Sequence, residues 1–293
     1  MILDAIRQLF SWLAKATAKQ VEAFVRMLTV AGLAALDPLG ELWAHEGQLP
    51  PASGWRVWLM LAGRGFGKTR AGAEWINGVA RARPGVRIAL VGATIADARA
   101  VMIEGVSGIL KVARGRRERL RWEPSLGRLR WQNGSEAQLF SGDNADGLRG
   151  PEHDFAWCDE LAKWREAEAA WDNLQFGLRR GRRPRALVTT TPRPIPLIKR
   201  IMGEEWTVTT RGRTSDNINL DEKTIEVLTA TYGGTRIGAQ ELDGVLLEDV
   251  EGALWTREVI ERARVHQIRP GTGRWQADGL TEGTHGRDAS TVG

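Results

Sequence analysis

The clearest indication of the fold is the segment Arg56-Val-Trp-Leu-Met-Leu-Ala-Gly-Arg-Gly-Phe-Gly-Lys-Thr69. Residues 56–62 form a short apolar run, which predicts a buried strand. Alternating glycines follow, and residues 69–82 have the pattern of a helix. We therefore expect a strand, a glycine-rich loop and a helix in direct succession.

The same alternation continues along the chain. Pro84-Gly85 precedes an apolar run at 87–92, and a helix is expected from Ile95 to Val112. Two such units favour a parallel βαβ arrangement. Further strands are expected at Glu136–Phe140, Phe155–Cys158, Ala186–Thr190 and Trp206–Thr209. The predicted fold class is α/β, with a mainly parallel sheet covered by helices on both faces.

Composition bounds the class of protein. The 293 residues are 42% hydrophobic and 26% charged, a balance that excludes wholesale disorder and a fibrous protein. A net charge of +5 permits an anionic partner without requiring one. Cys158 is the only cysteine, so the chain forms no intrachain disulfide and no cysteine-based zinc site. A reducing compartment fits this composition.

The N-terminal stretch from Ile2 to Leu36 is apolar but carries regular charges. It contains no uncharged run long enough to cross a bilayer, so no membrane-spanning segment is predicted. Apolar residues recur at helical spacing, which predicts two packing helices that end before Asp37-Pro38. A basic helix at a membrane surface or in a partner's groove remains an alternative.

The glycine-rich loop predicts a phosphate-binding site. Glycines allow backbone N–H groups to point at phosphate oxygens, and the following helix N-terminus adds positive potential. Lys68 can reach the terminal phosphates of a nucleoside triphosphate, and the Thr69 hydroxyl can bind Mg²⁺. Ala62 stands where the usual pattern has its first glycine, which shifts weight to the later glycines. The expected nucleotide-binding loop is Gly63, Arg64, Gly65, Phe66, Gly67, Lys68, Thr69 and Arg70.

Two acids follow the apolar run Phe155-Ala-Trp-Cys. Asp159 is the expected second Mg²⁺ ligand, held directly or through water. Glu160 can act as the general base that polarises the attacking water. This pair favours hydrolysis over phosphate transfer to a metabolite.

Phosphoryl transfer also needs positive charge on the γ-phosphate oxygens. Arg64 in the loop and Arg149 in a turn-rich segment are the candidates, and the alternative for each is a surface arginine. Thr189, Thr190 and Thr191 end an apolar run; their hydroxyls can bond the γ-phosphate or the attacking water, or simply fill a strand.

Together these motifs resemble the large subunit of tailed-phage DNA-packaging terminases and the related motors of gene transfer agents. The resemblance runs from about residue 43 to 264 and is carried by Gln48-Leu-Pro-Pro, Leu61–Trp75, Leu148–Glu160, Thr189–Pro192, Gln240–Gly244 and Glu251–Trp255. It implies an ATPase of the ASCE type, with ATP and Mg²⁺ as cofactors. It further implies that Gln48 contacts the adenine, that Arg149 is the arginine finger, and that the threonines at 189–191 couple hydrolysis to movement.

The implied organisation is N-terminal helices at 1–40, an ATPase domain with a small helical lid at 41–265, and a flexible tail at 266–293. Members of this family have a C-terminal nuclease domain, and the polar, glycine-rich tail does not supply its first metal-binding strand. We therefore expect no DNA cleavage from this chain. The implied partners are double-stranded DNA, a small terminase subunit, the portal of a procapsid and further copies in a ring, in the cytoplasm of a bacterial host.

Two basic stretches, 111–130 and 179–200, each contain eight Lys or Arg residues. Such clusters can follow DNA phosphates without reading sequence, as a translocating motor requires, or can be solvated surface. The leading hypothesis is an ATP-driven DNA translocase. The alternatives are a helicase-like ATPase and a truncated remnant that binds DNA or terminase partners without packaging.

Overall fold

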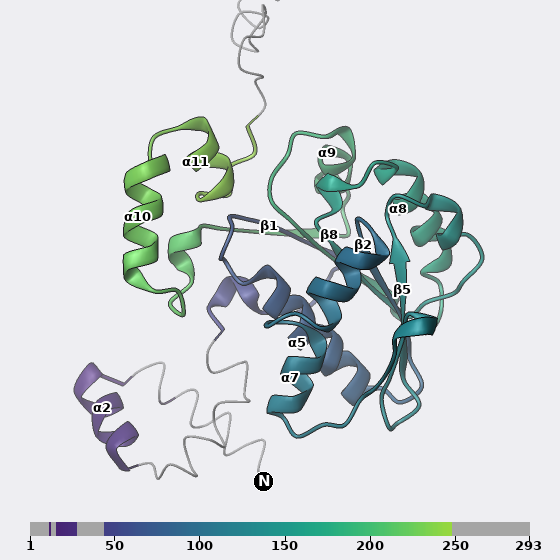
Figure 1. Cartoon of the computed structure of the whole chain (residues 1–293), viewed down its shortest axis with the longest axis horizontal. Helices are drawn as coiled ribbons and strands as arrows, with labels where there is room; N and C mark the ends of the chain where they lie inside the picture. The colour runs from purple at the N-terminus through teal and green to yellow at the C-terminus, as the bar shows by residue number, and fades with distance from the viewer. Residues whose placement is uncertain (1–11, 13–15, 28–43, 248–293) are drawn as a thin grey trace, which may run out of the picture. The chain divides into compact units, whose positions relative to one another are not determined.

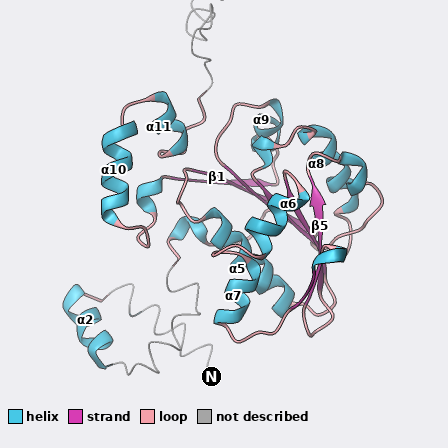
Figure 2. Cartoon of the chain, in the orientation of Figure 1, coloured by secondary structure: helices cyan, strands magenta, loops and turns pink. Residues whose placement is uncertain are grey.

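The computed structural model describes residues 12, 16–27 and 44–247. Eight strands form one sheet in the order β3-β4-β5-β2-β6-β7-β1-β8 (Figures 1 and 2). The strands are β1 Val57–Ala62, β2 Arg87–Gly92, β3 Arg121–Glu123, β4 Arg128–Arg130, β5 Glu136–Ser141, β6 Phe155–Asp159, β7 Arg185–Thr190 and β8 Thr207–Gly212. From β5 to β8 all neighbouring strands are parallel, as the sequence predicts.

Strand β1 is buried along its whole length because it lies between β7 and β8 and has helices on both faces. Its side chains alternate between two hydrophobic cores. Trp58 and Met60 pack into one core, and Leu59 and Leu61 into the other. A continuous apolar run is what a parallel strand with two covered faces requires.

The helices divide between the two faces of the sheet (Figure 1). Residues of α5 and α7 contribute to the core that contains Trp58, while α8 and α9 contribute to the other. The helices are α2 Ala18–Met27, α5 Lys68–Ala82, α6 Ile95–Asp97, α7 Ile109–Gly115, α8 Ala167–Gly177, α9 Pro196–Met202, α10 Glu222–Tyr232 and α11 Arg236–Glu241. The α/β fold with helices on both faces is confirmed.

The prediction of a single helix from Ile95 to Val112 is wrong. The structure has α6, then a π-helical segment at Ala98–Ile103 (η2), a break, and α7 as a separate helix. Gly105 lies in the break, where a Cβ would come within 2.5 Å of the Val101 carbonyl oxygen. Gly108 then caps the start of α7 in an extended conformation. The two glycines therefore divide the helical pattern into two pieces.

The structure also contains a hairpin that the sequence did not predict. Its strands, β3 and β4, add two antiparallel strands at one edge of the sheet. Each strand has only three residues, too few for a period-2 pattern to be recognised. Gly127 makes the turn with a φ of +58°, a conformation that favours glycine.

A small helical lid, α10 and α11, follows β8, as expected. No helix in the described ranges is both long and apolar enough to span a bilayer. Helix α2 lies within the second expected N-terminal helical stretch. Apart from residue 12, the first stretch lies outside the described residues, as does the tail at 266–293.

Candidate functional site

The carboxyl ends of β1, β6 and β7 converge, because neighbouring parallel strands end at the same edge of the sheet. A cavity of about 1450 Å³ opens there and continues along α5. It is lined by Gln48, Arg64, Gly65, Gly67, Lys68, Thr69, Arg70 and Glu160, among others. The glycine-rich loop and the second expected acid therefore reach one cleft.

The loop between β1 and α5 has the backbone shape that its glycines permit. Gly65 and Gly67 have φ values of +77° and +98°, which favour glycine. A Cβ on Gly67 would overlap Nε2, the side-chain amide nitrogen of Gln48. Helix α5 begins directly after this turn at Lys68, so its free N–H groups point into the cleft.

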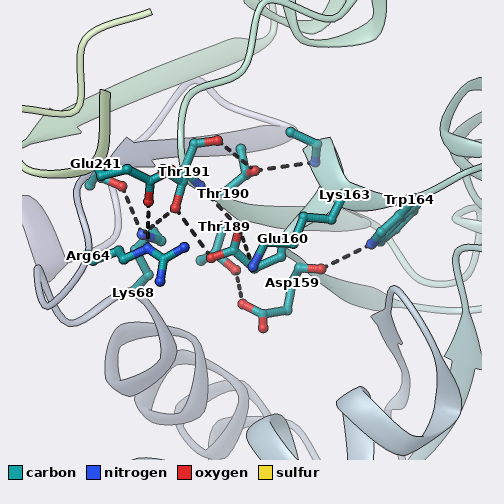
Figure 3. A network of polar contacts seen from close by, with 12 residues as sticks. Arg64, Lys68, Asp159, Glu160, Lys163, Trp164, Thr189, Thr190, Thr191 and Glu241 are labelled. Carbon is teal, nitrogen blue, oxygen red and sulfur yellow. Dashed lines mark hydrogen bonds and ion pairs between the residues drawn. The ribbon is translucent and has the colours of Figure 1, made fainter. Parts of the chain in front are cut away.

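Lys68 is 8% exposed, and the loop itself holds its ammonium group (Figure 3). Nζ donates to the carbonyl oxygens of Ala62 at 2.8 Å and Gly63 at 3.0 Å, and to Thr191 Oγ1 at 3.4 Å. Burial lowers the pKa of Lys68, and the negative charge of Glu160 partly opposes this effect. The amine is thus fixed at the base of the cleft beside the acids.

Asp159 ends β6 and is almost fully buried. Its Oδ1 accepts a hydrogen bond of 2.7 Å from the Thr189 hydroxyl, which in turn accepts from Trp157 Nε1 at 2.9 Å. Burial raises the pKa of Asp159 to about 6, against the lowering effect of the Thr189 bond. Ionising a buried carboxylate costs free energy, and a cation bound beside it would lower that cost.

Glu160 adopts an unusual backbone conformation, with a φ of +49°. Such a residue stores on the order of 1 kcal/mol of strain, which is typical of functional sites. Its carboxylate accepts from the Thr191 N–H at 3.4 Å and the Thr191 hydroxyl at 3.5 Å, and Lys163 Nζ lies 3.5 Å away. The turn directs Glu160 into the cleft while Asp159 remains in the sheet.

Thr189 and Thr190 end β7, Thr191 follows the strand, and the three have different contacts (Figure 3). Thr189 bonds Asp159, and Thr191 contacts both Lys68 and Glu160. The Thr190 hydroxyl accepts from the Ala162 N–H and donates to the Thr191 carbonyl. Thr191 therefore connects the phosphate loop with Glu160, and Thr189 holds Asp159 at the end of β6.

The lid and the segment that precedes it contact the loop, which the sequence did not predict. Arg64 Nε lies 2.5 Å from Glu241 Oε2 at the end of α11. The Thr214 hydroxyl donates to the Arg64 carbonyl at 2.6 Å, and Asn217 Nδ2 donates to the Gly65 carbonyl at 2.6 Å. The sequence shows Glu241 as the acidic residue of the Gln240-Glu241 motif, but no spacing rule predicts that it pairs with Arg64.

The remaining predicted residues lie around the cleft or apart from it. Gln48 Nε2 donates to the carbonyl oxygens of Phe66 and Gly67, and Phe66 is buried. Arg70 pairs with Glu74 at 2.8 Å on α5. Arg149 is exposed after the 3₁₀ turn Ala145–Leu148 (η4) and does not line the cavity.

The fold and this site define a P-loop NTPase with a mainly parallel sheet. A family model described as "Terminase large subunit, T4likevirus-type, N-terminal" matches residues 59–262, more than two thirds of the chain. The chain belongs to this family, as the motif resemblance implies. No curated protein sequence gives a significant match.

Solved structures agree on the fold. The large terminase ATPase domain of Thermus phage P74-26 is 20% identical, with a TM-score of 0.56 over 72% of this chain and 97% of that one. The large terminase of a thermophilic bacteriophage, in complex with ADP, is 15% identical, with a TM-score of 0.58. That match covers 73% of this chain and 53% of the other, so the chain spans about half the length of that relative.

Proposed function

We propose that this protein is an ATP-hydrolysing motor subunit that moves double-stranded DNA into a viral or phage-like capsid. One observation carries the proposal: Lys68 on the phosphate loop and Glu160 line one cleft and are joined by Thr191, while Asp159 lies buried beside them and is bonded to Thr189. This arrangement suits hydrolysis of a nucleoside triphosphate, and the family and the terminase neighbours make DNA packaging the process that hydrolysis would drive.

ATP is the proposed nucleotide, with its phosphates on the loop from Gly63 to Arg70 and its adenine beside Gln48. Lys68 would neutralise the terminal phosphates, and Glu160 would accept a proton from the attacking water. A structure of one fold neighbour contains ADP and another contains ATP-γ-S, which supports a nucleotide in this cleft.

Mg²⁺ is the proposed metal. Within the described residues no group of three His, Cys, Asp or Glu side chains could hold an ion, so a metal here depends on few protein ligands. Thr69 and Asp159 provide the hydroxyl and carboxylate oxygens that Mg²⁺ prefers, with phosphate and water as the usual further ligands. When bound, the ion would neutralise charge on the phosphate oxygens.

The proposed arginine finger is Arg149, with Arg64 as the candidate within the loop. Arg149 is exposed and lies outside the cavity of its own chain, a position suited to completing the site of a neighbouring subunit. Arg64 is engaged with Glu241, so it would need to leave the lid to reach a phosphate. Thr189, Thr190 and Thr191 would carry changes at the acids to the phosphate loop.

The proposed working state is a ring of identical subunits on the portal of a procapsid, with a small terminase subunit, in the cytoplasm of a bacterial host. The test is ATP hydrolysis by the purified chain with and without linear duplex DNA. We expect duplex to raise the rate. We expect Glu160→Gln to lower the rate by about 10²- to 10⁴-fold while ATP still binds.

Two outcomes would contradict the proposal. A wild-type rate no higher than that of Glu160→Gln would indicate a remnant without ATPase chemistry. Stimulation by single-stranded but not duplex DNA would indicate a helicase-like enzyme.

A further inference from the structure

Three arginines gather at the edge of the sheet opposite the phosphate loop. Arg185 begins β7, and its guanidinium lies 4.2 Å from the centroid of the Trp55 ring. Arg83 caps the far end of α5, with its guanidinium 5.2 Å from the centroid of the Phe155 ring. Phe155 and Arg185 are partners in the β6–β7 register, so the two ring contacts lie side by side. Arg183 precedes β7 in an exposed loop and completes what we call the arginine cluster.

The positive charge of the arginine cluster is not neutralised by the surrounding protein. Among the described residues, no acidic side chain forms an ion pair with Arg83, Arg183 or Arg185. Burial lowers the pKa of Arg185, and the charges of Arg183 and then Arg83 lower it further. The three guanidinium groups therefore repel one another, which is an arrangement that an anionic ligand would stabilise.

Other arginines of the two basic stretches form ion pairs with acidic side chains. Arg179 pairs with Glu152 at 2.8 Å, and Arg180 pairs with Asp154 at 3.1 Å. Basic residues of the β3–β4 hairpin share one carboxylate, since Arg121, Arg128 and Arg130 all lie within 4 Å of Glu123. Both basic stretches of the sequence thus contain arginines that pair with acids, and the second also contains Arg183 and Arg185, for which the described residues provide no acidic partner.

We infer that the arginine cluster is a contact surface for the phosphate backbone of double-stranded DNA, an assignment that rests on the proposed function. Guanidinium groups bind phosphate oxygens through two parallel hydrogen bonds. Stacking of two of them on Trp55 and Phe155 restricts their motion before the phosphates arrive, which reduces the entropy lost on binding.

The surroundings favour DNA over a protein partner. Protein interfaces are anchored by large apolar or aromatic side chains near their centre. Within the described residues, no exposed large apolar side chain lies in 81–87 or 179–185, the two segments that supply the cluster; the exposed Leu49, Val101 and Val106 belong to other segments of the cavity lining. Duplex DNA needs no such anchor because its phosphates supply most of the binding energy.

The arginine cluster is well separated from the ATP-hydrolysing residues. Arg83 and Arg185 line the same cavity as Lys68. The cavity runs along α5, with Lys68 at the start of the helix and Arg83 just after its end. This helix has 15 residues from Lys68 to Ala82, a length of about 22 Å at ~1.5 Å per residue. Neutralising the cluster should therefore change DNA binding and DNA-stimulated hydrolysis while the basal rate of hydrolysis stays unchanged.

The test compares the wild type with Arg83→Gln/Arg183→Gln/Arg185→Gln by fluorescence anisotropy, using a labelled linear duplex over a series of salt concentrations. The slope of log K against log salt should become shallower by about 2.7, or about 0.9 per lost phosphate contact. The matched control is Arg121→Gln/Arg128→Gln/Arg130→Gln, which removes the same charge from arginines that already share Glu123. It should change the slope by less than one third as much.

Arg183→Gln alone is the variant expected to leave the fold intact, since Arg183 is exposed. For this variant the slope of log K against log salt should become shallower by about 0.9. Equal slopes for the wild type, Arg183→Gln and the triple variant would overturn the inference alone. Loss of self-association with unchanged DNA binding would overturn it too, and would assign the cluster to a subunit contact. A wild-type chain that binds no duplex at all would instead contradict the proposed function.

Discussion

Asp159→Asn should make the nucleotide-free protein more stable while it removes Mg²⁺-dependent hydrolysis. Asp159 is buried, and its folded pKa of about 6 exceeds the ordinary value of 3.8. At about 1.4 kcal/mol per pKa unit, the ionised carboxylate costs about 3 kcal/mol of folding free energy near neutral pH. Asparagine has nearly the same shape, and its side-chain oxygen can accept the hydrogen bond from Thr189.

The sign of the pH dependence follows from the raised pKa. The folded protein binds the proton of Asp159 more tightly than the unfolded chain does, so this residue lowers stability as pH rises from about 4 to about 6. The advantage of Asp159→Asn should therefore be about 3 kcal/mol at pH 7.5 and only about 1 kcal/mol at pH 4.5. Thermal unfolding in EDTA at both pH values measures it, with an expected increase in Tm of roughly 6–12 °C at pH 7.5.

The control is Thr189→Val, which removes the hydroxyl that bonds the carboxylate and should lower stability, since the buried Oδ1 loses its donor. A variant Asp159→Asn that is no more stable than the wild type at pH 7.5 would contradict this prediction. So would an advantage that is the same at both pH values, because uncharged packing effects do not titrate.

Three further predictions concern the cleft, the lid and the core. Arg149→Ala should lower assembled ATPase activity on the order of 10³-fold with unchanged nucleotide affinity, and mixing it with Lys68→Ala subunits should restore activity, whereas no recovery would contradict a finger acting between subunits. Glu241→Gln should increase amide hydrogen exchange in α11 by up to about fivefold, as expected for loss of an ion pair worth about 0.2–1 kcal/mol; unchanged exchange would show that Arg64 does not hold the lid. Gly72→Ala places a Cβ against the Trp157 indole and should cost about 1–3 kcal/mol in chemical denaturation, while Gly78→Ala on the same helix meets nothing within 4 Å and should stabilise the fold.

Local patterns predicted the central part of the fold well. The β1 strand and the start of α5 follow from an apolar run, glycines and a helical pattern within one short stretch. Convergence of Lys68 with Asp159 was also predictable, because a parallel sheet brings the ends of β1 and β6 to one edge. These inferences need only local pattern and a rule of topology.

Features that depend on distant contacts were not predictable from the sequence. The partner of Arg64 is Glu241, 177 positions away, and no local pattern indicates that the lid would return to the loop. The two basic stretches looked equivalent, yet only the fold determines that Glu123 serves the hairpin arginines while Arg183 has no acidic partner among the described residues. The break at Gly105 and Gly108 was visible as glycines, but its effect on the helix depends on packing.

The proposed nucleotide site is tested most directly by a crystal structure with a slowly hydrolysed ATP analogue and Mn²⁺, because the anomalous scattering of Mn²⁺ locates the metal. We expect a γ-phosphate within hydrogen-bonding distance of Lys68 Nζ, and Mn²⁺ held by Thr69 and by Asp159 directly or through water. A triphosphate bound elsewhere, or a metal far from Asp159 with Glu160 directed away from the γ-phosphate, would contradict this expectation.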